Sequence, residues 1–206
     1  MIKIPQNIID SLPNFAKRIR TAFKKNKIGK PVLIGRVNLG KRRVYIVAAE
    51  IFQIYDPVKT DSKGRPLLVS RSKRTLAAYM HEQDLIFVYR SAVKPSLGPK
   101  SLERYLAHEI AHALDKDRLA KVGISAPKGD GQRFSDEYAC TPVEFEAEMS
   151  AIEAVEIPFI VNNYAAIAAQ YLNCISAHVG SWGRNKKLVK VFTRRLVEAL
   201  KNNSAF

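Results

Sequence analysis

The alternation of hydrophobic and polar positions divides the chain into a helical start, a strand-rich stretch and a helical remainder. In residues 6–26, apolar side chains recur at helical spacing while lysines and arginines occupy the other positions, which predicts an amphipathic helix. Residues 56–65, with Pro57 and Gly64, are expected to form a polar loop. Four runs rich in β-branched and aromatic residues predict short strands: 31–36, 43–54, 66–70 and 84–90.

The second half of the chain is expected to be helical. A helix begins near Ser101, a residue type that caps helix N-termini, and ends at about residues 116–119. Another begins at Pro142, because proline is favoured in the first helical turn, and its periodicity continues, with a break expected near Pro158, to about residue 177. A basic helix covers roughly residues 185–201. This order predicts an α+β protein with a small, mostly antiparallel sheet packed on helices.

The charge of the chain is high and unevenly distributed. Its 34 Lys and Arg against 19 Asp and Glu give a formal charge of +15. Residues 103–156 reverse the balance, with 12 acidic and 6 basic side chains. The flanking basic segments indicate an anionic partner, such as nucleic acid, an acidic protein or a membrane surface, with solubility as the alternative. No helix-turn-helix, zinc-finger or RNA-recognition signature accompanies them, so sequence-specific reading of bases is not indicated.

Cysteine usage and hydrophobicity bear on where the protein works. Cys140 and Cys174 are too few for a disulfide framework, and the N-terminus shows no secretory signal, so we expect a reducing, cytoplasmic location. Residues 157–183 contain no Asp, Glu, Lys or Arg, but Pro158 and several amides interrupt the run. Because hydrocarbon would desolvate those amides, we expect a buried core helix and no membrane span.

Two histidines four positions apart carry the strongest chemical signal. His108 and His112 share one face of the predicted helix, one turn apart, where both imidazoles can bind the same zinc ion. Glu109 lies beside them within the apolar stripe of the helix, where a carboxylate needs a reason to be buried. Next to zinc, it can take a proton from water and pass it to a leaving amine. The alternative is a solvated helix with two incidental histidines.

A third ligand is expected from a run of closely spaced glutamates. On a helix that begins at Pro142, Glu144 and Glu148 share a face, whereas Glu146 points elsewhere. One of the pair can bind zinc, and the other can orient a histidine ligand by accepting its hydrogen bond. We take Glu144 as the ligand, with Glu146 and Glu148 as alternatives. An acidic helix start favoured by the helix dipole would explain any one of them, but not their pairing with the histidines.

The histidine motif and the glutamate helix together resemble a known family. The chain resembles the zincins, in particular the anthrax lethal factor-like branch, through His-Glu-Ile-Ala-His-Ala-Leu-Asp at 108–115, Tyr138, and Glu-Phe-Glu-Ala-Glu at 144–148. The resemblance covers residues 103–150. Two features depart from the family pattern: Ala111 replaces a glycine, and the spacing between the tyrosine and the first glutamate is shorter.

The resemblance implies a zinc metallopeptidase, a hydrolase of peptide bonds. It places His108, His112 and Glu144 on zinc, Glu109 as the base, and Tyr138 as the group that stabilises the oxyanion or protonates the leaving group.

The resemblance also implies how the chain is organised. In zincins the sheet lies above the active-site helix and its edge strand pairs with the substrate peptide, and residues 84–90 are our candidate for that edge. We expect a basic N-terminal helix, 1–30, before one zincin-like domain, 31–206. Within that domain, the sheet, the active-site helices and a basic C-terminal helix are expected at 31–100, 101–179 and 185–201.

The alternative function rests on the basic segments. It is a nucleic-acid-associated or assembly protein, such as a phage or mobile-element virion protein, that keeps a zincin fold without peptidase activity. If the basic side chains converge on one surface, they form a footprint for a nucleic-acid backbone. They cluster at 17–30, 41–43, 71–74 and 186–195.

Overall fold

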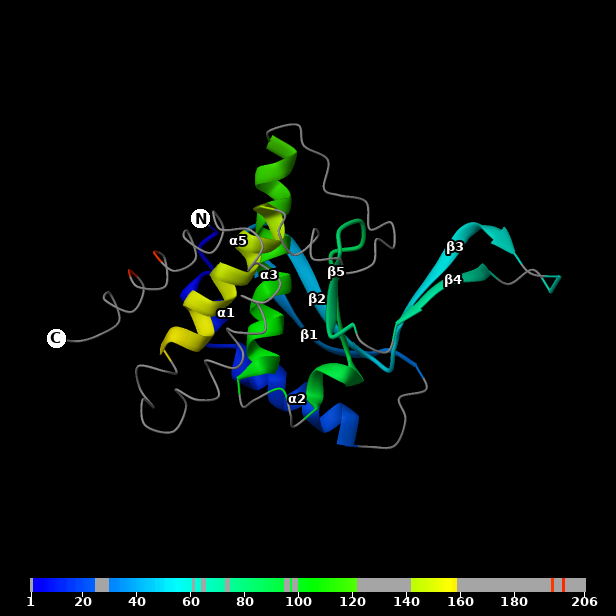
Figure 1. Ribbon diagram of the computed structural model, residues 1–206, viewed down its shortest axis with the longest axis horizontal. Coiled ribbons are helices and arrows are strands. Elements are labelled where there is room, and N and C mark those ends of the chain that lie inside the picture. Colours follow the sequence, from blue (N-terminus) through cyan, green and yellow to red (C-terminus); the bar gives the residue numbers. More distant parts are fainter. Residues whose placement is uncertain are drawn as a thin grey trace.

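The structure, a computed structural model, combines a four-stranded sheet with helices packed against it (Figure 1). The expected α+β class is therefore confirmed. A single hydrophobic core joins the N-terminal helices, the sheet and the central helices. The residues described are 2–24, 30–60, 62–63, 66–72, 75–94, 97, 100–121, 142–158, 194 and 198.

The N-terminal segment forms two helices where one was expected: α1 (Gln6–Ile9) and α2 (Leu12–Lys24). The hydroxyl of Ser11 donates to the carbonyl of Ile8 at 2.6 Å, a local bond that competes with the helical ladder at the break. α2 buries the apolar face that the periodicity predicts and packs it against the sheet and the central helix.

The sheet has the order β1–β2–β6–β5, and two of its three pairings are antiparallel. The parallel pairing joins β2 to β6, so β6 lies inside the sheet. The expectation that residues 84–90 form the edge is therefore wrong, because the edge on that side is β5, a strand the sequence pattern did not predict. The strands are β1 (Val32–Leu39), β2 (Arg42–Ala49), β5 (Ala77–Met80) and β6 (Leu85–Tyr89).

A separate two-stranded hairpin, β3 (Phe52–Thr60) and β4 (Pro66–Ser72), projects away from the main sheet (Figure 1). The strand expected over 43–54 is thus two strands, and the first half of the loop expected over 56–65 belongs to β3. Pro57 lies within β3 where the register with β4 is irregular, between Tyr55 and Thr60, a place where a residue without an N–H is tolerated.

Two positions in the first part of the sheet require glycine. A Cβ atom on Gly35 would lie 2.6 Å from the ring of Phe15, so glycine lets α2 approach β1 closely. Gly40 has a φ of 62°, the left-handed conformation needed in the tight turn between β1 and β2.

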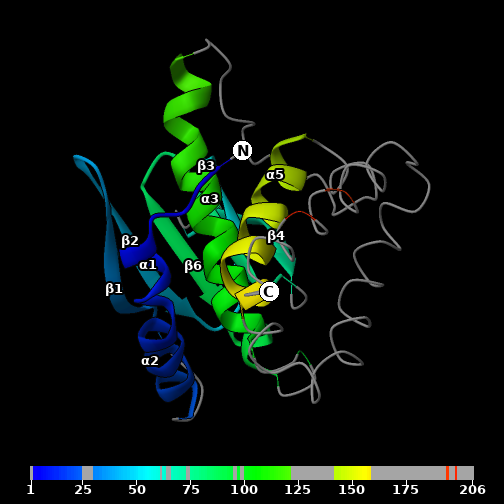
Figure 2. The same cartoon turned by 90° about the vertical axis from the view of Figure 1, so that its left-hand side faces the viewer.

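The second half supplies the central helices. After a 3-10 turn, η1 (Arg90–Val93), come α3 (Ser101–Lys121) and α5 (Pro142–Ala151), which continues into a π-helical turn, η3 (Ile152–Glu156). Figure 2 shows the sheet, α3 and α5 as successive layers.

Several expectations for the C-terminal part lie outside the described residues. They are the helix beyond residue 158 and, apart from Arg194 and Glu198, the basic helix 185–201. In the part of the chain that is described, no helix is both long and apolar enough to cross a membrane.

A polar clamp ties the turn between β5 and β6 to α3. The Asp84 carboxylate accepts hydrogen bonds from Arg42 at 2.8 Å, from Lys116 at 3.2 Å and from the Tyr79 hydroxyl. Arg42 also donates to the carbonyl of Ala113 in α3. Burial alone would raise the pKa of Asp84, but these hydrogen bonds and the nearby cations outweigh it and hold the pKa below its ordinary value.

Replacing Asp84 by asparagine should therefore destabilise the fold in a pH-dependent way. Asparagine tolerates the φ of 49° at this position, so the variant removes only the charge. We expect the free energy of unfolding at pH 7 to fall by about 1–2 kcal/mol. A carboxylate whose pKa is lower in the folded state than in the unfolded state stabilises the fold at pH values above the unfolded pKa. The difference in unfolding free energy between wild type and variant should therefore shrink below about pH 4. Chemical denaturation at pH 7 and below pH 4 measures the two free energies of unfolding, and the exposed Glu82→Gln is the control. A stability difference that persists at low pH would contradict this account.

Candidate metal centre

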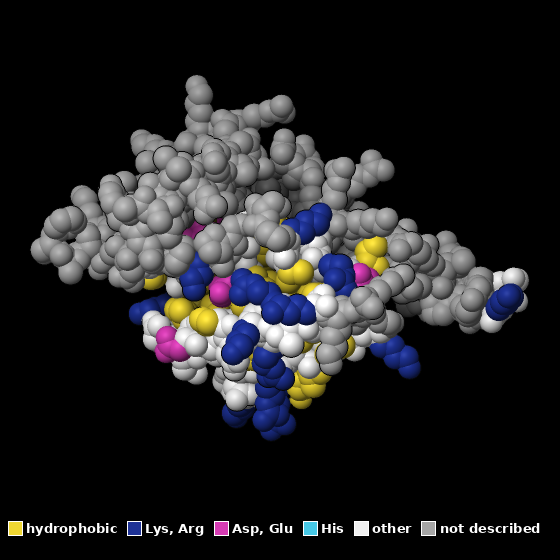
Figure 3. All heavy atoms as spheres, turned by 90° about the horizontal axis from the view of Figure 1, so that it is seen from below, with side chains coloured by type: hydrophobic (Ala, Val, Ile, Leu, Met, Phe, Trp, Pro, Cys, Tyr) yellow, Lys and Arg dark blue, Asp and Glu magenta, His cyan; other side chains and the backbone are white. Residues whose placement is uncertain are grey.

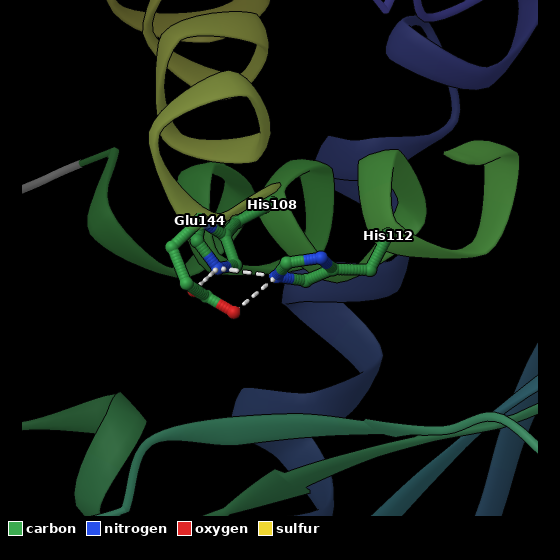
Figure 4. A group of neighbouring side chains, drawn as sticks. All are labelled: His108, His112 and Glu144. Carbon is green, nitrogen blue, oxygen red and sulfur yellow. Dashed lines mark hydrogen bonds and ion pairs between the residues drawn. The ribbon is translucent and has the colours of Figure 1, made fainter. Parts of the chain in front are cut away.

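The site forms where α3 and α5 pack together. α3 is held in the core by Leu102, Leu106 and Ile110, which are at most 1% exposed. This packing fixes the helix and turns His108 and His112 toward the first turn of α5. There Glu144 meets them, so that the two imidazoles and the carboxylate point toward one another (Figure 4).

The three side chains bring their ligand atoms into a compact triangle. Nε2 of His108 lies 3.0 Å from Nε2 of His112. The Glu144 carboxylate reaches both rings, with Oε2 3.2 Å from Nε2 of His108 and Oε1 3.2 Å from Nε2 of His112. All three side chains are largely buried, with 10–17% of their surface exposed.

This arrangement suits a zinc ion. Ligand atoms about 2.0–2.1 Å from a tetrahedral zinc lie about 3.3–3.4 Å from one another. The triangle edges of 3.0 and 3.2 Å are only slightly shorter. Two imidazoles and one carboxylate form a donor set that zinc prefers in catalytic sites, where the fourth position stays open. In the described part of the chain, only these three residues form such a group.

The electrostatics of the triangle also favour a cation. Burial would lower the pKa of His108, but the hydrogen bonds to Glu144 and Glu148 outweigh it and hold the pKa well above its ordinary value. Burial would raise the pKa of Glu144, but the hydrogen bonds from the two histidines hold it far below its ordinary value. The cluster therefore attracts positive charge, as a proton or as a metal ion.

The Glu109 side chain extends from α3 toward the edge strand β5. It is 8% exposed, and the backbone of Tyr79 in β5 is hydrogen-bonded to it. Burial raises the pKa of Glu109, although the nearby His108 and His112 oppose the shift. A buried carboxylate with a raised pKa beside the histidine pair can both accept and return a proton.

The two other glutamates of α5 have different surroundings. Glu148 lies one turn beyond Glu144, and its Oε2 is 2.9 Å from Nδ1 of His108, on the opposite side of the ring from the triangle. Glu146 does not join the ligand group, in keeping with its different helical face. Tyr138, the expected oxyanion group, lies outside the described residues.

Sequence reasoning missed a buried arginine next to this site. Arg104, 4% exposed, contacts Glu148 and also Glu156, which it reaches at 2.8 Å through Nε. Burial raises the pKa of Glu156, as does the charge of Glu148, while Arg104 opposes the shift. One signal was available, because Arg104 stands one turn before His108 on the same helix, among residues expected to be buried.

Comparisons of the chain with protein-family models, with curated proteins and with solved structures find no match. The interpretation of the site rests on its own geometry and chemistry.

Proposed function

We propose that the protein is a zinc-dependent metallopeptidase with a zincin-like fold, in which His108, His112 and Glu144 hold the metal. The observation that carries the proposal is the convergence of their ligand atoms, all within 4.8 Å of one another, next to a buried glutamate. Two incidental histidines on a solvated helix would not meet a carboxylate from a different helix inside the protein.

The residues have separable roles in peptide hydrolysis. Zinc, when bound, would polarise the scissile carbonyl and make a water molecule more acidic. Glu109 takes the proton of that water and passes it to the leaving amine. The hydrogen bond from the Tyr79 backbone keeps the Glu109 carboxylate in place between α3 and β5.

The edge strand β5 is the candidate for substrate binding. It pairs with β6 on one side and borders no other described strand on the other. An extended peptide can add to such an edge through main-chain hydrogen bonds. Because β5 contacts both α3 and Glu109, a peptide there would pass the proposed catalytic group.

Peptide cleavage tests this function directly. The zinc-loaded protein is screened against a diverse peptide library, before and after the metal is removed with a chelator. We expect cleavage that disappears with the metal and returns when zinc is restored. A zinc-loaded protein that cuts no member of the library would favour a structural role for the site.

A second candidate function, nucleic-acid association, is favoured by one surface. Figure 3 views the molecule from the side of α2, where lysines and arginines spread over much of the described surface. Lys17, Arg18 and Lys24 are exposed on α2, and the guanidinium of Arg18 lies against β1 at Gly35. Other basic residues are already used within the protein: Arg20 pairs with Glu103, and Arg42 belongs to the polar clamp.

If this surface binds nucleic acid, its contacts should be with phosphates. We expect duplex DNA to bind without sequence preference, with log affinity falling linearly with log salt concentration. A triple variant, Lys17→Glu, Arg18→Glu and Lys24→Glu, should lower the salt slope by about 2–3, because each phosphate contact contributes about 0.9.

The control triple changes the same number of exposed basic residues elsewhere, with Lys3→Glu, Lys41→Glu and Lys63→Glu. Fluorescence anisotropy at several salt concentrations measures the slopes. If the two triples behave alike, the α2 surface is not the binding site. If the wild type fails to bind at low salt, nucleic-acid association is wrong.

A further inference from the structure

Arg104 links the proposed metal centre to the interior of the helical layer. Its guanidinium contacts Oε1 of Glu148, while Oε2 of the same carboxylate lies 2.9 Å from Nδ1 of His108. Its Nε is 2.8 Å from Oε1 of Glu156. A continuous chain of contacts thus runs from His108 through Glu148 and Arg104 to Glu156.

In this series of contacts, the two oxygens of Glu148 have different partners. Oε1 contacts the guanidinium of Arg104 and Oε2 faces the ring of His108, so the two contacts together limit how the carboxylate can rotate. The guanidinium is always charged and planar, so it can hold one oxygen while the other faces His108. Nδ1 of His108 then carries the proton, and Nε2 is the unprotonated nitrogen that can bind the metal.

The π-helical turn after α5 explains how a second carboxylate reaches the same arginine. In an uninterrupted α-helix, a residue eight positions after Glu148 would be rotated by about 80° from it. A π-helical turn contains more residues per turn than an α-helix and reduces that rotation. η3 therefore brings Glu156 back to the side of Arg104, where all three side chains are buried.

We propose that Arg104 is a positioning residue for the metal centre, which acts through Glu148 to fix the orientation and tautomer of His108. Glu156 forms an ion pair with the same guanidinium at its Nε. The proposal rests on the proposed zinc site, and it assigns to Arg104 a role in metal affinity rather than in the chemical step.

A double-mutant cycle on zinc affinity tests the proposal. Arg104→Met and Glu148→Gln should each weaken zinc binding by about 10–100-fold, the usual effect of losing a group that orients a ligand. Because Arg104 acts through Glu148, the double variant should bind zinc no more weakly than Glu148→Gln alone. Competition with a chromophoric chelator measures the affinities, and circular dichroism confirms folding.

Two controls separate positioning from packing. Arg20→Met removes another arginine paired with a glutamate of α3, at 3.3 Å, but away from His108, and should leave zinc affinity unchanged. Arg104→Lys keeps the charge without the planar fork and should give an intermediate loss. If Arg104→Met does not fold, the test uses Arg104→Lys and the double variant, which removes the charges of Arg104 and Glu148 together.

A spectroscopic readout completes the experiment. The Nδ1 proton of His108 should give a slowly exchanging proton resonance in the wild type and in Arg20→Met, and that resonance should be lost in Arg104→Met. Unchanged zinc affinity and a retained resonance in the Arg104 variants would overturn the proposal while leaving the zinc site intact. A wild type that binds no zinc would overturn the zinc site and the proposal together.

Discussion

Replacing Glu109 by glutamine is expected to lower peptide cleavage by about 100- to 10,000-fold, the usual contribution of a general acid–base group. The zinc content should not change, because Glu109 is not in the ligand triangle. Folding should also persist, since the variant keeps the shape of a side chain that is 8% exposed and removes a buried charge. Cleavage by wild type and variant is measured with zinc content confirmed in both.

The matched control for this variant is Glu103→Gln. Glu103 is another buried glutamate of α3, and it pairs with Arg20 instead of facing the proposed metal centre. Its replacement should leave the cleavage rate of the folded protein close to that of the wild type. Equal rates in the wild type and in Glu109→Gln would contradict the catalytic role of Glu109, even if zinc is present.

Replacing Glu144 by alanine is expected to weaken zinc binding by more than the roughly 10–100-fold that loss of an orienting partner costs. The physical reason is that Glu144 supplies the only carboxylate in the triangle, at 3.2 Å from both histidine nitrogens. Glu146→Ala makes the same chemical change two residues along the same helix and should leave zinc affinity nearly unchanged. Titration with zinc against a competing chelator measures both.

These two variants separate a wrong ligand assignment from a wrong location of the metal site. If Glu146→Ala lost zinc and Glu144→Ala kept it, the ligand assignment would be wrong while a metal centre remained. If neither change altered zinc affinity, the metal would be bound elsewhere and the triangle would not be its site.

The part of the site that depends on helical periodicity was predictable. His108 and His112 lie one turn apart on one helix, and this local geometry follows from their spacing alone. The shared face of Glu144 and Glu148 follows in the same way. Which of the two meets Nε2 and which meets Nδ1 of His108 depends on how α5 packs against α3, a tertiary contact that spacing within one helix does not determine.

The sheet was harder to predict because its pairing is non-local. β6 has a clear strand pattern, but only its parallel pairing with β2 places it inside the sheet. β5 is short and contains two alanines, which have little strand preference, so its pattern gave no signal. The contact between Glu109 and the edge strand therefore could not be anticipated, although a buried role for Glu109 could.

The buried partners of the site were missed for a related reason. Arg104 reads as a surface residue by type, since arginine is almost never buried unless it is paired. Its partner Glu156 lies far along the chain, and the π-helical turn that aims Glu156 has no simple sequence pattern.

The zinc content of the purified protein tests the central claim most directly. Elemental analysis after zinc reconstitution and removal of loosely bound metal should give one zinc per chain in the wild type. The His112→Ala and Glu144→Ala variants should lose most of it while they remain folded. A wild type that holds no tightly bound transition metal after reconstitution would contradict the account.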